Sequence, residues 1–193
     1  MCQQERNHKS VESLELSLDR INSWISNCDQ KAGFLLATIG IVLAILFATD
    51  FVGGVKKYII EPFLCYFDKP VEYEFSLIRF LFFIVLVSSV ITCAVSAIFA
   101  LLAISATVDS KKQRTNNPTL SNKSYLFFQT ISSVDFETYS KFGQISYADD
   151  LMSQIYINSS ICTKKFNRYK VALGSFYAVV ISIAIMYVLY LFV

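Results

Sequence analysis

Residues 32–49, AGFLLATIGIVLAILFAT, decide the fold class, because none of them is charged. A helix formed by these residues would carry no charge on any of its faces. Two further runs share this property, FLFFIVLVSSVITCAVSAIFALLAISATV at 80–108 and VALGSFYAVVISIAIMYVLYLFV at 171–193. A helix that crosses a bilayer needs about 20 mainly apolar residues, within a range of about 17–25. The sequence therefore predicts an all-α membrane protein with three transmembrane helices, at 32–49, 80–107 and 171–193.

The composition argues against the alternative that these runs are core helices of a water-soluble protein. Hydrophobic residues make up 54% of the chain and charged residues only 17%, whereas soluble domains carry about 25% charged residues. Three helices that are apolar on all faces would leave too little polar surface to cover them in a chain of 193 residues. We do not expect the first run to be an export signal, because the residues before it include several acids.

The segments that lead into the first and last runs have apolar residues at helical spacing. The first of these stripes comprises Val11, Leu14, Leu18, Ile21, Trp24, Ile25 and Cys28. The second comprises Ala148, Leu151, Ile155, Cys162, Phe166, Tyr169 and Leu173. Neither segment contains a proline, so each helix should continue into its span. We predict one domain, 1–193, in which a helix at 11–31 and a helix before the last span pack together as a helical stalk.

The basic residues predict the orientation of the chain in the membrane. Nine of the 17 Lys and Arg residues lie between Lys111 and Lys170, whereas the loop at 50–79 balances its few basic residues with acids. Because loops rich in Lys and Arg stay in the cytoplasm, the N-terminus and 108–170 should be cytoplasmic. The loop at 50–79, in which Gly53-Gly54 and two prolines are expected to interrupt helices, and the C-terminus should be external.

Several kinds of chemistry have no support in the sequence. A net charge of +2 is too small to indicate binding of a nucleic-acid polymer. The five cysteines form no CxxC pair and the single histidine belongs to no cluster, so we expect no disulfide, no metal site and no cofactor. HExxH, GxSxG, P-loop and GxGxxG motifs are absent from the sequence, which indicates that the protein is not an enzyme.

Polar residues gather where the stalk should meet the membrane. One reading is hydrogen bonding between the two helices, with lysines that reach the interface. The other is a polar cavity that binds a small anionic ligand, in which lysine meets phosphate, amides read a base edge, and Trp24 or Phe128 stacks on the base. Asp29 lies so close to the apolar run that its charge needs a partner or water. The predicted ligand-binding residues are Trp24, Asn27, Asp29, Lys31, Phe128, Asp150, Gln154 and Lys164.

Three stretches resemble the transmembrane effectors of the Pycsar family. They are RINSWISNCDQKAGFLLATIG at 20–40, YLFFQTISSVDFETYSKF at 125–142 and DDLMSQIYINSSICTKKFNRYKVAL at 149–173. The family pattern is departed from at Cys28, where alanine is usual, and at Gln129, where glycine is usual. The resemblance covers about 20–193 and rests on the order of the three stretches relative to the spans.

The resemblance implies an antiphage defence effector of the bacterial inner membrane. Its ligand would be cyclic CMP or cyclic UMP, made by a pyrimidine nucleotide cyclase during infection, and its response would impair the lipid bilayer as a homo-oligomer and cause abortive infection. A membrane scaffold without a signalling role, or a subunit of a larger complex, remains the alternative. An enzyme acting on lipid has the weakest support, since no group of acid, base and nucleophile is present.

Overall fold

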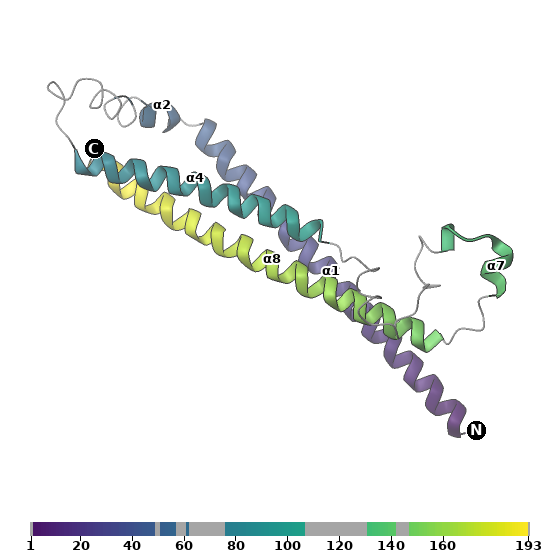
Figure 1. Cartoon of the computed structure of the whole chain (residues 1–193). Coiled ribbons are helices and arrows are strands. Elements are labelled where there is room, and N and C mark those ends of the chain that lie inside the picture. Colours follow the sequence, from purple (N-terminus) through teal and green to yellow (C-terminus); the bar gives the residue numbers. More distant parts are fainter. Residues whose placement is uncertain are drawn as a thin grey trace. The chain divides into compact units, whose positions relative to one another are not determined.

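The computed structural model describes residues 2–48, 51–56, 61, 76–106, 131–141 and 147–192. These residues form helices and connecting turns and contain no strand, which confirms the all-α prediction. The helices are α1 (Cys2–Ala48), α2 (Phe51–Val55), α4 (Leu77–Ile104), α7 (Phe136–Lys141) and α8 (Tyr147–Tyr190) (Figure 1).

Two compact units divide the chain between them. The first unit comprises residues 1–30 and 105–166, and the second comprises 31–104 and 167–193. Helices α1 and α8 each supply residues to both units, because neither is interrupted. At 47 and 44 residues, both are more than twice as long as a bilayer requires. The first and last spans are thus continuous with long helical extensions, as the two apolar stripes predict.

The second unit has the surface of a membrane-spanning bundle. Helices α1, α4 and α8 each contain a window that is long and apolar enough to cross a bilayer, and only 17% of each window is buried inside the protein. Large apolar side chains such as Phe34, Phe47 and Tyr187 are exposed on the outward faces. Soluble proteins rarely expose apolar surface of this extent. By length and composition, the three helices are therefore the three spans, and the chain is a membrane protein.

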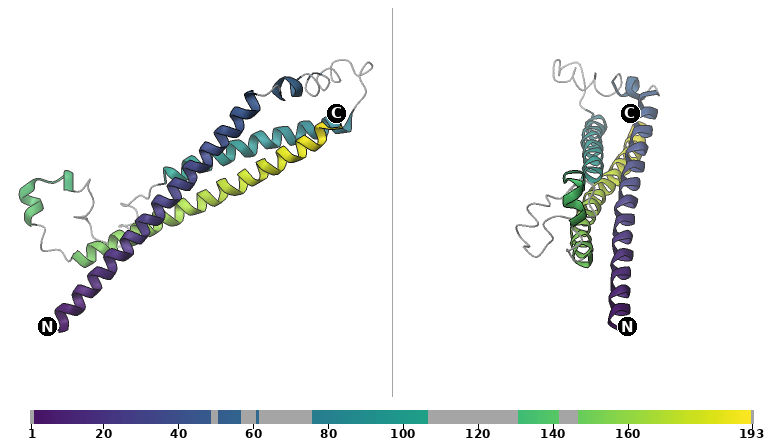
Figure 2. Two further views of the ribbon diagram at one scale, coloured as in Figure 1. Left: turned by 180° about the vertical axis from the view of Figure 1, so that it is seen from behind. Right: turned by 90° about the vertical axis from the view of Figure 1, so that its right-hand side faces the viewer.

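Small residues bring α4 close to the C-terminal half of α8. Ala100 and Ala172 are fully buried, and the buried Ser96 donates a hydrogen bond of 2.8 Å from its hydroxyl to the carbonyl oxygen of Ala172. Figure 1 and the opposite view on the left of Figure 2 both show the two helices side by side. Without water, small side chains and hydrogen bonds between helices are what hold spans together. Leu35 and Ile39 of α1 complete this core.

Helix α2 corrects one detail of the sequence analysis. Gly53-Gly54 was expected to interrupt helices, yet both glycines lie within α2. The next residue, Val55, is buried against Phe82 of α4 and Met186 of α8. Burial of this kind outweighs the loss of about 1 kcal/mol that a glycine brings to a helix.

An arginine caps the last turn of α4. The guanidinium of Arg168 on α8 donates a hydrogen bond of 2.7 Å, through Nη1, to the carbonyl oxygen of Leu102 on α4. The last four carbonyls of a helix have no partner within it, and a cation there complements the helix dipole. Arg168 therefore stabilises the C-terminus of α4 and joins it to α8 within the second unit.

In the first unit, α1 and α8 meet along a seven-residue repeat. The least exposed side chains of α1 are Val11, Leu14, Leu18, Ile21, Ile25 and Cys28, alternately three and four residues apart. On α8, Leu151, Asn158 and Lys165 recur seven residues apart with Ile155 and Cys162 between them, and Ser153 and Ile157 are buried as well. This spacing is that of a coiled coil. We call these two rows, with the polar groups at their edges, the seam.

Two members of the predicted stripes do not follow the seam. Trp24 is 52% exposed, because it lies one position before the repeat at Ile25. On α8 the predicted stripe passes through Phe166, which is half-buried, whereas the structure buries Lys165 instead. The seven-residue repeat, rather than the run of apolar residues, decides which side chain turns inward.

Candidate ligand-binding site

An ion pair lies near the C-terminal end of the seam, where the first unit's part of α1 ends at residue 30 and its part of α8 ends at residue 166. The ammonium Nζ of Lys165 on α8 donates to Oδ1 of Asp29 on α1 at 2.6 Å. The lysine side chain is only 6% exposed, but that of Asp29 is 36% exposed. Asp29 thus has the partner that the sequence analysis required for its charge.

The difference in exposure makes the pair asymmetric. Moving a charge from water into the protein interior costs several kcal/mol unless a partner compensates it. Asp29 is already partly hydrated, whereas Lys165 is almost fully enclosed. The seam therefore holds a buried cation whose counter-ion is accessible to solvent.

A pair of amides lies one heptad before the ion pair. The Nδ2 group of Asn158 donates to Oδ1 of Asn22 at 2.9 Å. Both polar pairs join residues whose numbers differ by 136, so the two helices run parallel. Asn158 and Lys165 belong to the row on α8, whereas their partners lie at the edge of the seam, Asn22 exposed and Asp29 half-buried. Polar contacts between particular side chains of two helices favour one alignment of the helices over others. Asn22 with Asn158 and Asp29 with Lys165 therefore set the alignment of α1 against α8.

A third polar contact lies further towards the start of α8. The hydroxyl of Tyr147 donates a hydrogen bond of 2.8 Å to Oε1 of Glu15. This bond raises the pKa of Tyr147, and desolvation and the negative charges of Glu15 and Asp150 raise it further. The contact is exposed, so it adds to the pairing of the two helices without enclosing a site.

Three of the predicted site residues share an outward face of α1. Trp24, Asn27 and Lys31 are three and four residues apart and all exposed, so they point in similar directions. Lys31 is the first residue of the second unit. None of the three belongs to the seam, and Asp29 faces away from them towards Lys165.

The predicted residues of α8 differ in their surroundings. Asp150 is buried, Gln154 is half-buried and Lys164 is exposed. Phe128 lies outside the described residues. The contacts above join Asp29 to Lys165 rather than to another predicted residue, so the predicted set is dispersed around two helices.

The sequence analysis missed Lys165 in favour of its neighbour Lys164. A signal was present in the spacing, because Leu151, Asn158 and Lys165 are each seven residues apart. Adjacent helical positions point about 100° apart, so only one of the two lysines can enter the seam. Counting in steps of seven from Leu151 leads through Asn158 to Lys165, which is therefore the lysine that enters the seam.

Hydroxyl groups near the ion pair serve their own helix. Ser159 donates to the carbonyl oxygen of Ile155 at 2.7 Å, and Thr163 donates to that of Ser159 at 3.0 Å. Such bonds satisfy hydroxyl donors within a helix. Near the ion pair, the described polar contacts between α1 and α8 therefore come from amide, carboxylate and ammonium groups.

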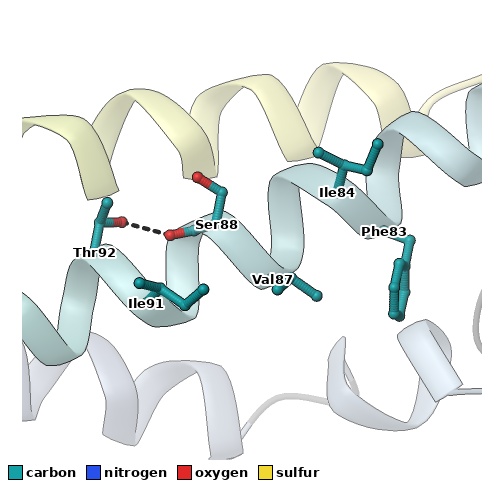
Figure 3. Close-up of a pocket in the computed structure, with 6 residues that line it drawn as sticks. All are labelled: Phe83, Ile84, Val87, Ser88, Ile91 and Thr92. Atoms are coloured by element: carbon teal, nitrogen blue, oxygen red, sulfur yellow. Dashed lines mark hydrogen bonds between the residues drawn. The ribbon is translucent and has the colours of Figure 1, made fainter.

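Two hollows in the second unit have an apolar lining. One of about 350 Å³ lies among α1, α4 and α8, with Cys93 and Met186 on its wall. The other lies on α4 alone, where the Thr92 hydroxyl bonds the Ser88 carbonyl oxygen at 2.8 Å (Figure 3). None of their lining residues is charged, so neither suits an anionic ligand.

Comparison with known proteins identifies the relatives of the chain. The model of the Pycsar effector protein domain, PycTM, matches residues 72–193. The Pycsar effector protein GmPycTM of Gulbenkiania mobilis is 34% identical over 157 residues, which cover 79% of each protein. No solved structure was found to be significantly similar.

Proposed function

The chain belongs to the Pycsar effector family of antiphage defence effectors, and from this premise we propose that it senses a cyclic pyrimidine nucleotide and then impairs the membrane. The ligand is cyclic CMP or cyclic UMP, supplied by a pyrimidine nucleotide cyclase. Binding in the first unit leads to leakage through the second, and the infected cell stops growing. The chain acts without catalysis of its own.

The seam carries this proposal. Its polar pairs lie on α1 and α8, and the same two helices supply two of the three spans. A helix transmits a change in its packing along its length, because its backbone hydrogen bonds hold it rigid. A ligand that alters the seam therefore acts on the helices that form the spans.

The ligand must favour one arrangement of the seam over another. A ligand that binds both arrangements equally shifts nothing, whatever its affinity. To shift the ratio of two arrangements of the seam from 1:99 to 99:1, the ligand must bind one arrangement about 5.5 kcal/mol more tightly than the other. The ionic and amide contacts of the seam are the groups whose rearrangement can supply it.

The candidate contacts are those of the sequence analysis. In this proposal Lys31 and Lys164 attract the phosphate, Asn27 and Gln154 read the base edge, and Trp24 or Phe128 stacks on the base. Asp29 and Asp150 complete the polar lining. Of these residues, Trp24, Asn27, Lys31 and Lys164 are exposed to solvent, which lets a soluble ligand reach them.

The proposed location is the bacterial inner membrane. The first unit and the N-terminus face the cytoplasm, where a cyclase releases the nucleotide, and the C-terminus is external. The chain acts as a homo-oligomer in the bilayer. The predicted spans 32–49, 80–107 and 171–193 contain no charged residue, so we propose general leakage rather than an ion-selective pore.

Reconstitution in dye-loaded liposomes tests this function. Cyclic CMP or cyclic UMP should release the dye, and cyclic AMP and cyclic GMP should not. Protein-free liposomes with the same nucleotides give the background. No release with any of the four, together with no change in thermal stability on adding them, would contradict the proposal and favour a membrane scaffold.

A further inference from the structure

We propose that three amide side chains at the seam, those of Asn22, Gln154 and Asn158, read the hydrogen-bonding edge of the pyrimidine base. The inference rests on the proposed function, because the base is that of the cyclic nucleotide. It keeps Gln154 as a base contact and adds the amide pair of Asn22 and Asn158. It also makes the bound base a bridge between α1 and α8.

The first observation is that the amide pair uses only part of its hydrogen-bonding capacity. Asn158 donates through Nδ2 to Oδ1 of Asn22 at 2.9 Å. Within the described part of the chain, neither side chain has a further hydrogen bond. A primary amide offers two N–H donors and an oxygen that accepts two bonds. The Nδ2 group of Asn22 and the Oδ1 atom of Asn158 therefore remain for a ligand.

The second observation is a third amide one helical turn away. Gln154 lies four residues before Asn158 on α8, so the two side chains lie on the same face, about 6 Å apart along the helix axis. Gln154 is half-buried, and no described residue bonds its side chain. An amide that is partly withdrawn from water gains stability from a partner with matching donors and acceptors.

The third observation is that a soluble molecule can reach these amides. Asn22 is exposed and Asn158 is half-buried, so the pair lies at the outer edge of the seam rather than inside it. All three residues belong to the first unit. The site is therefore formed within one compact unit and is open to the solvent.

The chemistry of an amide suits a base edge better than a phosphate. Uracil presents an N–H donor between two carbonyl acceptors, and cytosine presents an amino donor beside a ring-nitrogen acceptor. An amide can pair with either, since turning it by 180° exchanges its donor and its acceptor. Proteins read unpaired bases through hydrogen bonds of this kind. The same three residues can therefore serve both cyclic CMP and cyclic UMP.

The base becomes a bridge because its contacts come from two helices. Asn22 belongs to α1, whereas Gln154 and Asn158 belong to α8. Sliding α1 along α8 by one turn would move the two asparagines apart by about 5.4 Å, beyond the reach of hydrogen bonds of about 3 Å. The ligand therefore prefers the alignment in which residues whose numbers differ by 136 are paired.

Replacing both asparagines with leucine separates base reading from helix pairing. Exchanging both partners of a hydrogen bond for apolar groups of similar size is close to neutral for stability. Asn22→Leu with Asn158→Leu should therefore leave the Tm of the full-length protein in detergent almost unchanged. Its affinity for cyclic CMP and cyclic UMP should fall at least about tenfold, which corresponds to about 1.4 kcal/mol. If the pair only aligned the helices, this variant would bind both nucleotides as the wild type does.

A modified ligand gives a second test that needs no change in the protein. Cyclic UMP methylated at N3 of the base has lost the donor of that edge but keeps its ribose and phosphate. It should bind the wild type at least about tenfold more weakly than cyclic UMP. When Gln154→Leu is added to the two leucine substitutions, the two ligands should bind within about twofold of each other, because the amides that distinguish them are gone.

Matched controls remove exposed amides elsewhere on the same helices. Gln30→Ala on α1 and Asn167→Ala on α8 alter exposed side chains, so the affinity for both nucleotides should stay within about twofold of the wild type. A loss in these controls as large as in the leucine pair would assign the effect to a general disturbance of the helices and overturn the inference.

The remaining outcomes separate this inference from the proposed function. Wild-type affinity in the leucine pair, or equal affinity of the wild type for cyclic UMP and its N3-methyl form, would overturn base reading by the amides and leave nucleotide sensing in place. Absence of any binding of cyclic CMP and cyclic UMP to the wild type would overturn both.

Discussion

Replacing Asp29 with asparagine should destabilise the protein more than replacing Lys165 with methionine, although both changes break the same ion pair. Asp29→Asn removes the carboxylate that lies 2.6 Å from a cation only 6% exposed. Lys165→Met leaves a carboxylate that is 36% exposed and can be hydrated. The cost therefore depends on which partner remains.

The magnitudes follow from the burial of the remaining charge. Removing one partner of a fully buried pair costs about 3–5 kcal/mol. Water reaches Asp29 and screens part of the interaction, so we expect a loss of roughly 1.5–3 kcal/mol for Asp29→Asn. For Lys165→Met we expect about 0–1 kcal/mol, as for a surface pair.

Thermal unfolding in a mild detergent measures this asymmetry. One kcal/mol corresponds to roughly 2–4 °C in a chain of this size. Asp29→Asn should therefore lower the Tm by roughly 3–12 °C, and Lys165→Met by no more than about 4 °C. The double variant Asp29→Asn/Lys165→Met should lie close to Lys165→Met, because the buried ammonium is absent from both. Equal losses in the two single variants, or a larger loss in Lys165→Met, would refute the reasoning.

Three further predictions concern other contacts. Arg168→Ala should lower the stability by about 1 kcal/mol, since the C-terminus of α4 loses its cation; thermal unfolding measures it, and a loss as large in Arg168→Lys would contradict the dipole part of the explanation. Ser96→Ala should cost about 0.5–1.5 kcal/mol in the same assay, because the Ala172 carbonyl oxygen loses its buried donor, and an unchanged Tm would refute this role. The phenol of Tyr147 should ionise above its usual pKa of about 10, so the bond to Glu15 contributes below that pH and is lost as the pH rises through the raised pKa. Absorbance at 295 nm, compared between the wild type and Tyr147→Phe, follows this ionisation, and Glu15→Gln should return it to the usual range; an unshifted midpoint in the wild type would contradict the bond.

The spans could be predicted from the sequence, because a bilayer imposes a simple rule on it. A run of some 20 mainly apolar, uncharged residues is typical of a membrane-spanning helix. The three runs coincide with parts of α1, α4 and α8. The helical extensions followed from periodicity and from the absence of proline. The structure adds helix before Val11, since the residues from Cys2 onward include several good helix formers and no breaker.

The seam was harder to predict, because a polar residue at a core position looks like a surface residue in a single sequence. Lys164 and Lys165 have the same chemistry, and only the phase of the seven-residue repeat distinguishes them. Trp24 resembles a core residue by type but is exposed by position. The partner of Asp29 required the alignment of two helices that are far apart in the chain, which no local pattern contains.

The central claim, that binding at the seam controls the membrane, is tested most directly by measuring both events in the same proteoliposomes. Nucleotide binding and dye release should show the same midpoint in the wild type. Lys31→Ala and Gln154→Ala should move both midpoints to higher nucleotide concentration while the protein stays inserted. Dye release that keeps its wild-type dose dependence in variants with weakened nucleotide binding would contradict the account.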